Sequence, residues 1–324
     1  MSKRFIGIAE ETTFRTPVSA TEWIDIVSES INPNRNVIDV ETAGRRELVA
    51  RVPGPFFVSG SFDMIVNADN ITKLLKWLLG NVSTSDDGGS PAVYKHEFTP
   101  GDSIKSFTLE ICPGVGGQSR QIAGTAVRSI AFEAPARELL TATVEVLGAK
   151  EALISSSTPT FSSLRPFVFF EGSLTMEGSS IARAEAFRCT IANTIPDDTH
   201  VLGDMFLPAI DLLGIRVTGD MDVAFTSWDY WKRFYGSATA TEPQTSIEPV
   251  SLNFKMTGQS TGSSVAGFEN YSLEIDIPKA ILDTTNANFD RRERIVQGLG
   301  FGAVYDEDSD YIVKVTVVNK KSAP

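Results

Sequence analysis

The chain has 324 residues, of which 42% are hydrophobic and 22% are charged, and its formal net charge is −12. This length predicts two domains of about 150 residues, with enough apolar residues for two cores. The acidic balance argues against a protein that grips nucleic acid, because neutralising phosphates requires clustered Lys and Arg. No run of about 18 apolar residues predicts a membrane span. Glu10 and Glu11 interrupt the N-terminal stretch before a signal-peptide core can form, so we expect a chain made and kept in a cytoplasm.

The first fifty-five residues divide into three predicted segments. Residues 1–22 are expected to form an irregular arm, and residues 23–27 alternate like a strand. Residues 32–55 are polar and basic, with breakers at Pro33, Gly44, Pro53, Gly54 and Pro55. They predict a long loop or extended hairpin, of a length that tends to carry function. A mobile surface loop is the alternative interpretation.

A strand followed by a helix comes next. Residues 58–66 alternate between apolar and polar side chains, which predicts a strand with one buried face. Ile71, Leu74, Leu75 and Leu78 follow helical spacing, and Gly80 ends the pattern. One amphipathic helix among strands must lie across a sheet to bury its apolar stripe. Further strands are predicted at 93–99 and 106–112, and two runs at 126–133 and 139–147 flank a turn.

The second half repeats this order. Residues 217–225 echo 58–66 and precede a Trp-containing helical pattern that stops at Gly236, and residues 271–275 echo 107–111. Two final runs at 294–305 and 311–318 flank an acidic turn, as a terminal hairpin would. We interpret this as a tandem duplication, with a first module at 1–153, a linker at 154–164 and a second module at 165–324. The predicted fold is mainly β: two antiparallel β-sandwich or small-barrel modules, each with one flanking α-helix.

No motif for catalysis, a cofactor or a metal ion accompanies this pattern. His96 and His200 lack metal-ligand spacing or a nucleophile elbow. Residues 306–310 offer alternate carboxylates like a calcium loop, but Tyr311 and Val317 stand where that loop needs Gly and Glu. Cys112 and Cys189 occupy unmatched positions and predict two buried, reduced thiols. We therefore expect no enzyme, no cofactor and no metal site.

Residues 11–20, Glu-Thr-Thr-Phe-Arg-Thr-Pro-Val-Ser-Ala, resemble the opening of the tail tube proteins of bacteriophages and archaeal viruses, also called major tail proteins. Those chains tend to begin with E-T-x-[FY]-G-T-P, so Arg15 stands at the usual glycine and leaves the backbone of this turn open. The resemblance continues through 43–46, 58–80, 107–111 and the closing runs of each half. It implies modules that form rings around one β-lined channel, usually six modules to a ring. Two modules in one chain then imply a homotrimeric ring with pseudo-sixfold symmetry.

The same resemblance implies partners and surfaces. Rings of this chain would stack into a tube in the virion tail, assembled in the host cytoplasm, with tape-measure, tail-tip and tail-terminator proteins as partners. DNA would pass through the lumen without specific binding. Acidic side chains on the polar faces of the repeated strands are candidates for the lumen, where carboxylates repel phosphate, although an outward face is the alternative for each: Asp63, Glu110, Asp220, Asp222, Glu274 and Asp276. Among these, Asp63 is matched with Asp222 and Glu110 with Glu274. The N-terminal arm and the loop 32–55 are candidates for ring-to-ring contacts, or for solvated surface, through Arg35, Arg45, Arg46, Glu47 and Arg51.

Two other classes of protein stay open at this point. One is a β-sandwich adhesin or decoration protein that does not polymerise. The other is an enzyme on a β-sandwich, such as a carbohydrate hydrolase, which would need a pair of carboxylates. Polymerisation separates the tube protein from both.

Overall fold

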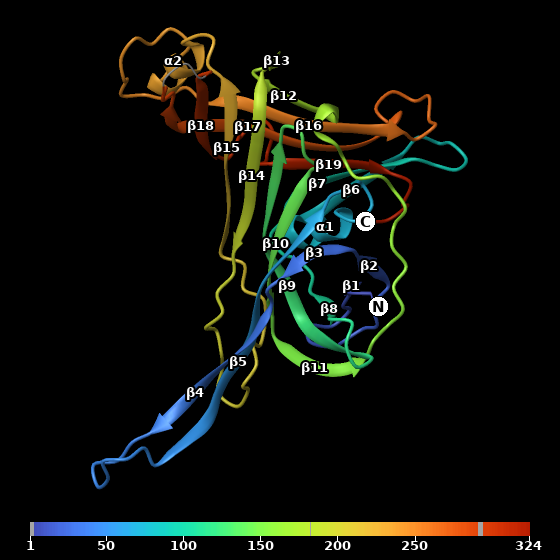
Figure 1. Cartoon of the computed structure of the whole chain (residues 1–324), viewed down its shortest axis with the longest axis vertical. Coiled ribbons are helices and arrows are strands. Elements are labelled where there is room, and N and C mark those ends of the chain that lie inside the picture. The colour runs from blue at the N-terminus through green and yellow to red at the C-terminus, as the bar shows by residue number, and fades with distance from the viewer. Residues whose placement is uncertain (1–2, 182, 291–293) are drawn as a thin grey trace.

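The computed structural model describes residues 3–181, 183–290 and 294–324. Within these ranges the chain is mainly antiparallel β-structure with two α-helices, as predicted (Figure 1). The first half contains β1 (Phe5–Glu10), β2 (Glu22–Ile24), β3 (Ile26–Glu29), β4 (Asn32–Val40), β5 (Ala50–Ile65), α1 (Thr72–Leu79), β6 (Gly80–Asp86), β7 (Tyr94–Pro100), β8 (Phe107–Cys112), β9 (Gln118–Pro135), β10 (Thr141–Gly148) and β11 (Lys150–Ser155). The second half contains β12 (Gly172–Met176), β13 (Ser179–Ser180), β14 (Ala184–Thr194), β15 (Gly214–Ala224), α2 (Asp229–Tyr235), β16 (Val250–Ser260), β17 (Asn270–Asn286), β18 (Val296–Ala303) and β19 (Lys314–Asn319).

In the first half, the long strand β9 belongs to two sheets. Its N-terminal part pairs with β8 and β11, and its C-terminal part pairs with β10, which pairs in turn with β5. The change occurs beside Gly124, whose φ of 66° lies in the left-handed region that glycine adopts without strain. One strand therefore ties both sheets of this half together.

In the second half, the long strand β17 likewise pairs with different strands along its two parts. Its N-terminal part pairs with β16 and β19, and its C-terminal part pairs with β18, which pairs in turn with β15. The predicted terminal hairpin at 294–318 is therefore wrong. β18 and β19 pair with different parts of β17, and the segment between them carries the chain from one sheet to the other.

Two strand pairs join the halves. β9 pairs with β14, with Glu133 opposite Arg188, and β7 pairs with β19. The first pair makes one continuous sheet in the order β3–β5–β10–β9–β14–β15–β18–β17. Figure 1 shows β9, β10 and β14 running side by side in the middle of the molecule.

The helices lie where the sequence predicts them, but they are buried to different extents. α1 buries Leu74, Leu75 and Leu78 against the core, and its Trp77 ring stacks on Phe107 with 4.2 Å between ring centroids. No residue of α2 is fully buried.

The prediction of an irregular arm at 1–22 is wrong for β1. Residues 5–9 of this strand are buried, because it lies between β2 and β8. Cys112 and Cys189 are buried free thiols, as predicted, and burial raises the pKa of the Cys189 thiol to about 12.

Candidate lumen and assembly surfaces

The continuous sheet has one apolar face and one polar face. Side chains of the apolar face, such as Phe62, Val144 and Ile130, are buried in the core. The alternate positions carry polar or small residues, as strand geometry requires for a sheet covered on one side. One lateral row across seven strands, read from strand to strand, is Ser28, Asp63, Thr143, Ala131, Thr190, Thr218 and Gly302. The polar face therefore runs unbroken from the first half into the second.

A charge cluster sits on this face where the halves join. Nη1 of Arg188 lies 2.5 Å from Oδ2 of Asp220 and 3.1 Å from Oδ2 of Asp222, and its Nε lies 3.2 Å from Oε1 of Glu133. Hydrogen bonding to Asp220 raises the pKa of the Arg188 guanidinium, against the opposing effect of burial. One cation thus holds three carboxylates from β9 and β15.

Asp63 lies on the same face, further along the sheet. Its carboxylate accepts hydrogen bonds from the hydroxyls of Ser28, at 2.5 Å, and Thr143, at 2.6 Å. These two bonds lower the pKa of Asp63 below its ordinary value. Gly60 faces Val146 in β10, at the irregular step in the pairing of β10 with β9, and Gly219 faces Phe301 in β18, at the irregular step in the pairing of β18 with β17. Three residues further on, Asp63 and Asp222 therefore occupy the same register position, as the sequence predicts.

The other three acidic candidates lie elsewhere. Glu110 is 2% exposed, and its carboxylate accepts hydrogen bonds from the backbone and hydroxyl of Ser157, so it holds the linker and does not face solvent. Glu274 pairs with Lys255 at 3.0 Å, and Asp276 accepts a hydrogen bond from the hydroxyl of Tyr311. Both are on the N-terminal part of β17, beside β16 and β19, and not on the face that holds Asp63. Glu110 and Glu274 therefore do not form a matched pair.

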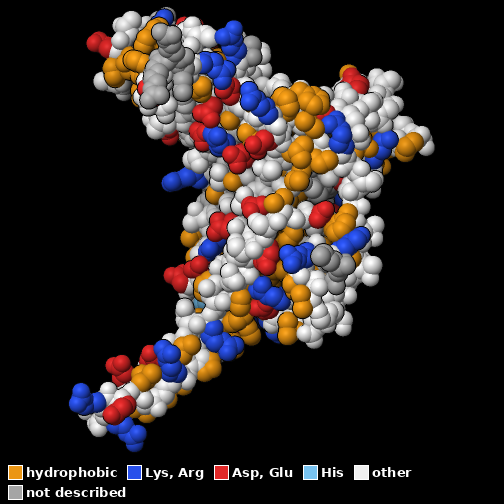
Figure 2. All heavy atoms as spheres, in the orientation of Figure 1, with side chains coloured by type: hydrophobic (Ala, Val, Ile, Leu, Met, Phe, Trp, Pro, Cys, Tyr) orange, Lys and Arg blue, Asp and Glu red, His pale blue; other side chains and the backbone are white. Residues whose placement is uncertain are grey.

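The predicted long loop is a β-hairpin, β4–β5, that projects from the body of the molecule (Figure 1). Arg51 forms a bidentate ion pair with Asp39 across the hairpin, and the Arg35 guanidinium lies over the Phe56 ring. Figure 2 shows charged side chains at the tip of this arm and hydrophobic ones along it. Arg45, Arg46 and Glu47 at the tip are exposed, and within the described residues they form no ion pair. Five exposed aliphatic residues lie along the arm: Val37, Ile38, Leu48, Val49 and Val52.

A second projecting segment, residues 195–213, hangs beside the base of this hairpin. It is attached by the amide of Phe56, which donates to the carbonyl of Met205, and by the pair Arg15–Asp204 at 2.6 Å. It too carries exposed apolar residues: Val201, Leu202, Met205 and Leu213. No periodic pattern in the sequence predicts this segment, although its apolar residues within a polar stretch are a signal that marks it.

The turn that carries the Glu-Thr-Thr-Phe-Arg-Thr-Pro phrase is organised by Glu11. This buried carboxylate accepts hydrogen bonds from the hydroxyls of Ser106 and Thr108 and from the amides of Gly124 and Arg15, all between 2.7 and 3.1 Å. Arg15 has a φ of 62°, in the left-handed region that favours glycine. The turn therefore keeps the left-handed backbone conformation that the usual glycine would adopt, with Arg15 in its place.

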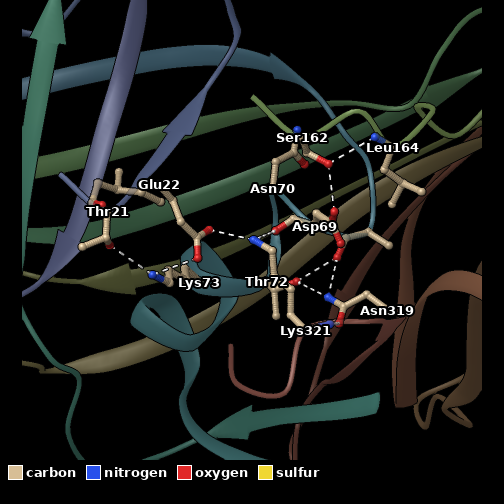
Figure 3. Close-up of polar contacts among 12 residues, drawn as sticks. Thr21, Glu22, Asp69, Asn70, Thr72, Lys73, Ser162, Leu164, Asn319 and Lys321 are labelled. Atoms are coloured by element: carbon tan, nitrogen blue, oxygen red, sulfur yellow. Dashed lines mark hydrogen bonds and ion pairs between the residues drawn. The ribbon is translucent and has the colours of Figure 1, made fainter. Parts of the chain in front are cut away.

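The C-terminal segment and the linker are fixed on the first half near α1 (Figure 3). Asn319 donates to the carbonyl of Ala68 and the hydroxyl of Thr72, and Lys321 pairs with Glu22 at 2.8 Å. From the linker, the hydroxyl of Ser162 donates to the Asp69 carboxylate. Residues from both ends of the chain and from its middle thus meet at the start of this helix.

An uncovered polar sheet face and two projecting apolar segments are the features of a structural β-protein that associates through its surface. In the described ranges, no helix is long and apolar enough to span a membrane, and no group of three or more His, Cys, Asp or Glu could hold a metal ion. The family model for the phage tail tube protein matches residues 1–303, and the chain belongs to that family. As a member of that family, the chain is a structural protein of a viral tail. Comparison with curated proteins gave no match.

Proposed function

We propose that three copies of this chain form a ring, that rings stack into a hollow tube, and that viral DNA passes through the tube during ejection. The observation that carries this proposal is the eight-strand sheet, with one polar face uncovered and, within the described residues, an open outer edge on the strand at each end. Open strand edges template pairing with another chain, and closing a ring removes them.

The order of pairing supports two repeated modules. In the first half the order is β5–β10–β9–β8–β1, and in the second it is β15–β18–β17–β16–β12. β11 and β19 are then equivalent, because each pairs with the N-terminal part of the long strand. This correspondence matches β8 with β16, one strand earlier than the sequence echo between 107–111 and 271–275.

The junction inside the chain supplies a template for the junction between chains. Within one chain, β14 lies next to β9 in the sheet. Because β17 corresponds to β9, β3 of the next copy is expected to lie next to the C-terminal part of β17. In the described residues, β3 pairs only with β5, and residues 281–286 of β17 pair only with β18. Matching of the registers places Asn32, the first residue of β4, opposite Asn286 of the neighbouring copy. Three such junctions would close the ring.

The polar face of this sheet then lines the lumen. On it, carboxylates outnumber guanidinium groups: Asp63, Glu133, Glu145, Asp220, Asp222 and Asp283 stand against Arg128, Arg188 and Arg216. Arg188 is already surrounded by three of these carboxylates. Such a wall repels phosphate and offers few sites for counterion release, so DNA slides without binding.

The two projecting segments are the surfaces for stacking. The β4–β5 hairpin, with Arg35, Arg45, Arg46, Glu47 and Arg51, and the segment 195–213 both expose aliphatic side chains that contact with another ring would cover. Tape-measure, tail-tip and tail-terminator proteins are the further partners that this function implies.

A decoration protein or adhesin that does not polymerise is the second candidate, and the enzyme alternative has no observation in its favour. Expression of the chain, negative-stain electron microscopy and mass measurement of discrete species separate the candidates. Hollow filaments, or rings of three chains with six lobes, are the expected result. Rings of six chains would refute the trimer, and a chain that stays monomeric at high concentration would refute the tube.

A further inference from the structure

The start of α1 and the last strand of the second half meet inside the chain. β19 pairs with β7, and Asn319, at the end of β19, donates to Ala68 and Thr72 at the first turn of α1. Ile71, the residue before α1, and Val315 of β19 are both 0% exposed. The corner where β19 meets the start of α1 is therefore buried within the chain.

The equivalent positions at the start of α2 and in β11 are exposed to solvent. Trp228 precedes α2 as Ile71 precedes α1, and it is 60% exposed. Leu153 faces Arg120 in β9 as Val315 faces Ile275 in β17, and it is 70% exposed. Two buried apolar positions of one corner thus correspond to two exposed apolar positions of the other.

We infer that Trp228 of one copy and Leu153 of the next are both buried at the chain-to-chain corner of the ring, where β11 of the second copy lies beside the start of α2. This inference rests on the proposed ring of repeated modules. The rotation that carries the first half onto the second carries the α1–β19 corner onto a corner between α2 and β11 of the neighbouring copy. Because that copy is absent from a single chain, both residues face solvent.

The local chemistry fits a strand with an exposed apolar side chain as the occupant. The Trp228 ring makes edge contacts with Phe225 and Trp231, with ring centroids 5.0 and 5.6 Å apart, so it is held by two aromatic neighbours. Within the described residues, β11 pairs only with β9 and leaves its other edge open. Rigid aromatic side chains and open strand edges are both features of association surfaces.

Thiol labelling tests this corner in the full chain. The variants are Leu153→Cys and Trp228→Cys, with Val82→Cys on the outer hairpin strand β6 as the exposed control. The native Cys112 and Cys189 are buried and give the background. For both test positions, we expect maleimide labelling to be about tenfold slower in assembled than in unassembled protein, since the reagent reaches the thiol only when the junction opens. The control should label equally fast in both states.

A second pair of variants separates this corner from the rest of the assembly. Leu153→Glu and Trp228→Glu should fold with unchanged circular dichroism and melting temperature, because both residues are exposed, but should form no rings; Val82→Glu should still assemble. If wild-type protein assembles while either test cysteine labels as fast as in the free chain, the inference is wrong and the tube function stands. A wild-type chain that never assembles contradicts the tube function, and this inference falls with it.

Discussion

Removal of the Glu11 carboxylate should destabilise the first half more than any surface substitution. Its four donors are two hydroxyls, which can rotate toward other acceptors, and two backbone amides, which cannot. The Gly124 amide is buried, and that of Arg15 is partly buried. A buried donor left without an acceptor costs about 1–3 kcal/mol, so Glu11→Ala should lower the free energy of unfolding by about 2–4 kcal/mol. Glu11→Gln keeps one carbonyl oxygen for Gly124 and should cost about half as much.

Urea denaturation of the unassembled chain measures these changes, because contacts between copies would otherwise add stability. Tryptophan fluorescence and circular dichroism should be recorded together, since two halves can unfold in separate transitions. Glu47→Ala, at the exposed tip of the hairpin, is the matched control and should stay within about 0.5 kcal/mol of wild type. The reasoning fails if Glu11→Ala behaves like this control, or if the Ala and Gln variants are equally destabilised.

Three further outcomes are expected. Burial raises the pKa of Glu10, but hydrogen bonds from Lys76, Lys105 and Trp77 outweigh it and bring the pKa to about 2. The stability from this depressed pKa is present at neutral pH and is lost as pH falls below the ordinary value of 4.5 toward 2. Glu10→Gln should therefore differ from wild type in urea titrations at pH 7, by about 1 kcal/mol, and much less at pH 2.5; an equal difference at both would contradict the assignment. Ile38→Asp should leave single rings intact and abolish filaments in electron micrographs, and long filaments would exclude the hairpin from stacking. Asn319→Ala should lower the melting temperature through a loss of about 1–3 kcal/mol, and an unchanged temperature would show that the C-terminal segment does not hold the first half.

Local periodicity predicted the strand–helix units well, because each pattern is complete within its own segment. Alternation in 58–66 and helical spacing in 71–78 need no distant partner to be recognised, and β5 and α1 lie there. β1 was missed because its residues are buried on both faces, so no alternation marks it as a strand. Its partner β8 lies about a hundred residues away in the sequence.

Of the two acidic matches, strand pairing keeps one and removes the other. The sequence echo aligned Gly60 with Gly219, and both glycines lie against a carbonyl of the neighbouring strand: a Cβ would meet that of Ser30 at Gly60 and that of Arg188 at Gly219. The echo of 107–111 in 271–275 joined β8 to β17, whereas strand pairing matches β8 with β16, so Glu110 and Glu274 are not equivalent. The sequence echo also does not report the burial of Glu110, which depends on the linker residue Ser157.

The pairing of β9 with β14 has a consequence for the order of assembly. Because both strands belong to one polypeptide, and the linker between the halves is fixed through Ser157 and Ser162, β14 meets β9 at an effective concentration on the order of millimolar. This junction forms once, as each chain folds, whatever the amount of protein in the cell. In the proposed ring, only every second junction then depends on encounters between molecules. Closing such a ring requires three molecules to meet instead of six, and dilution can open it only at the junctions between chains.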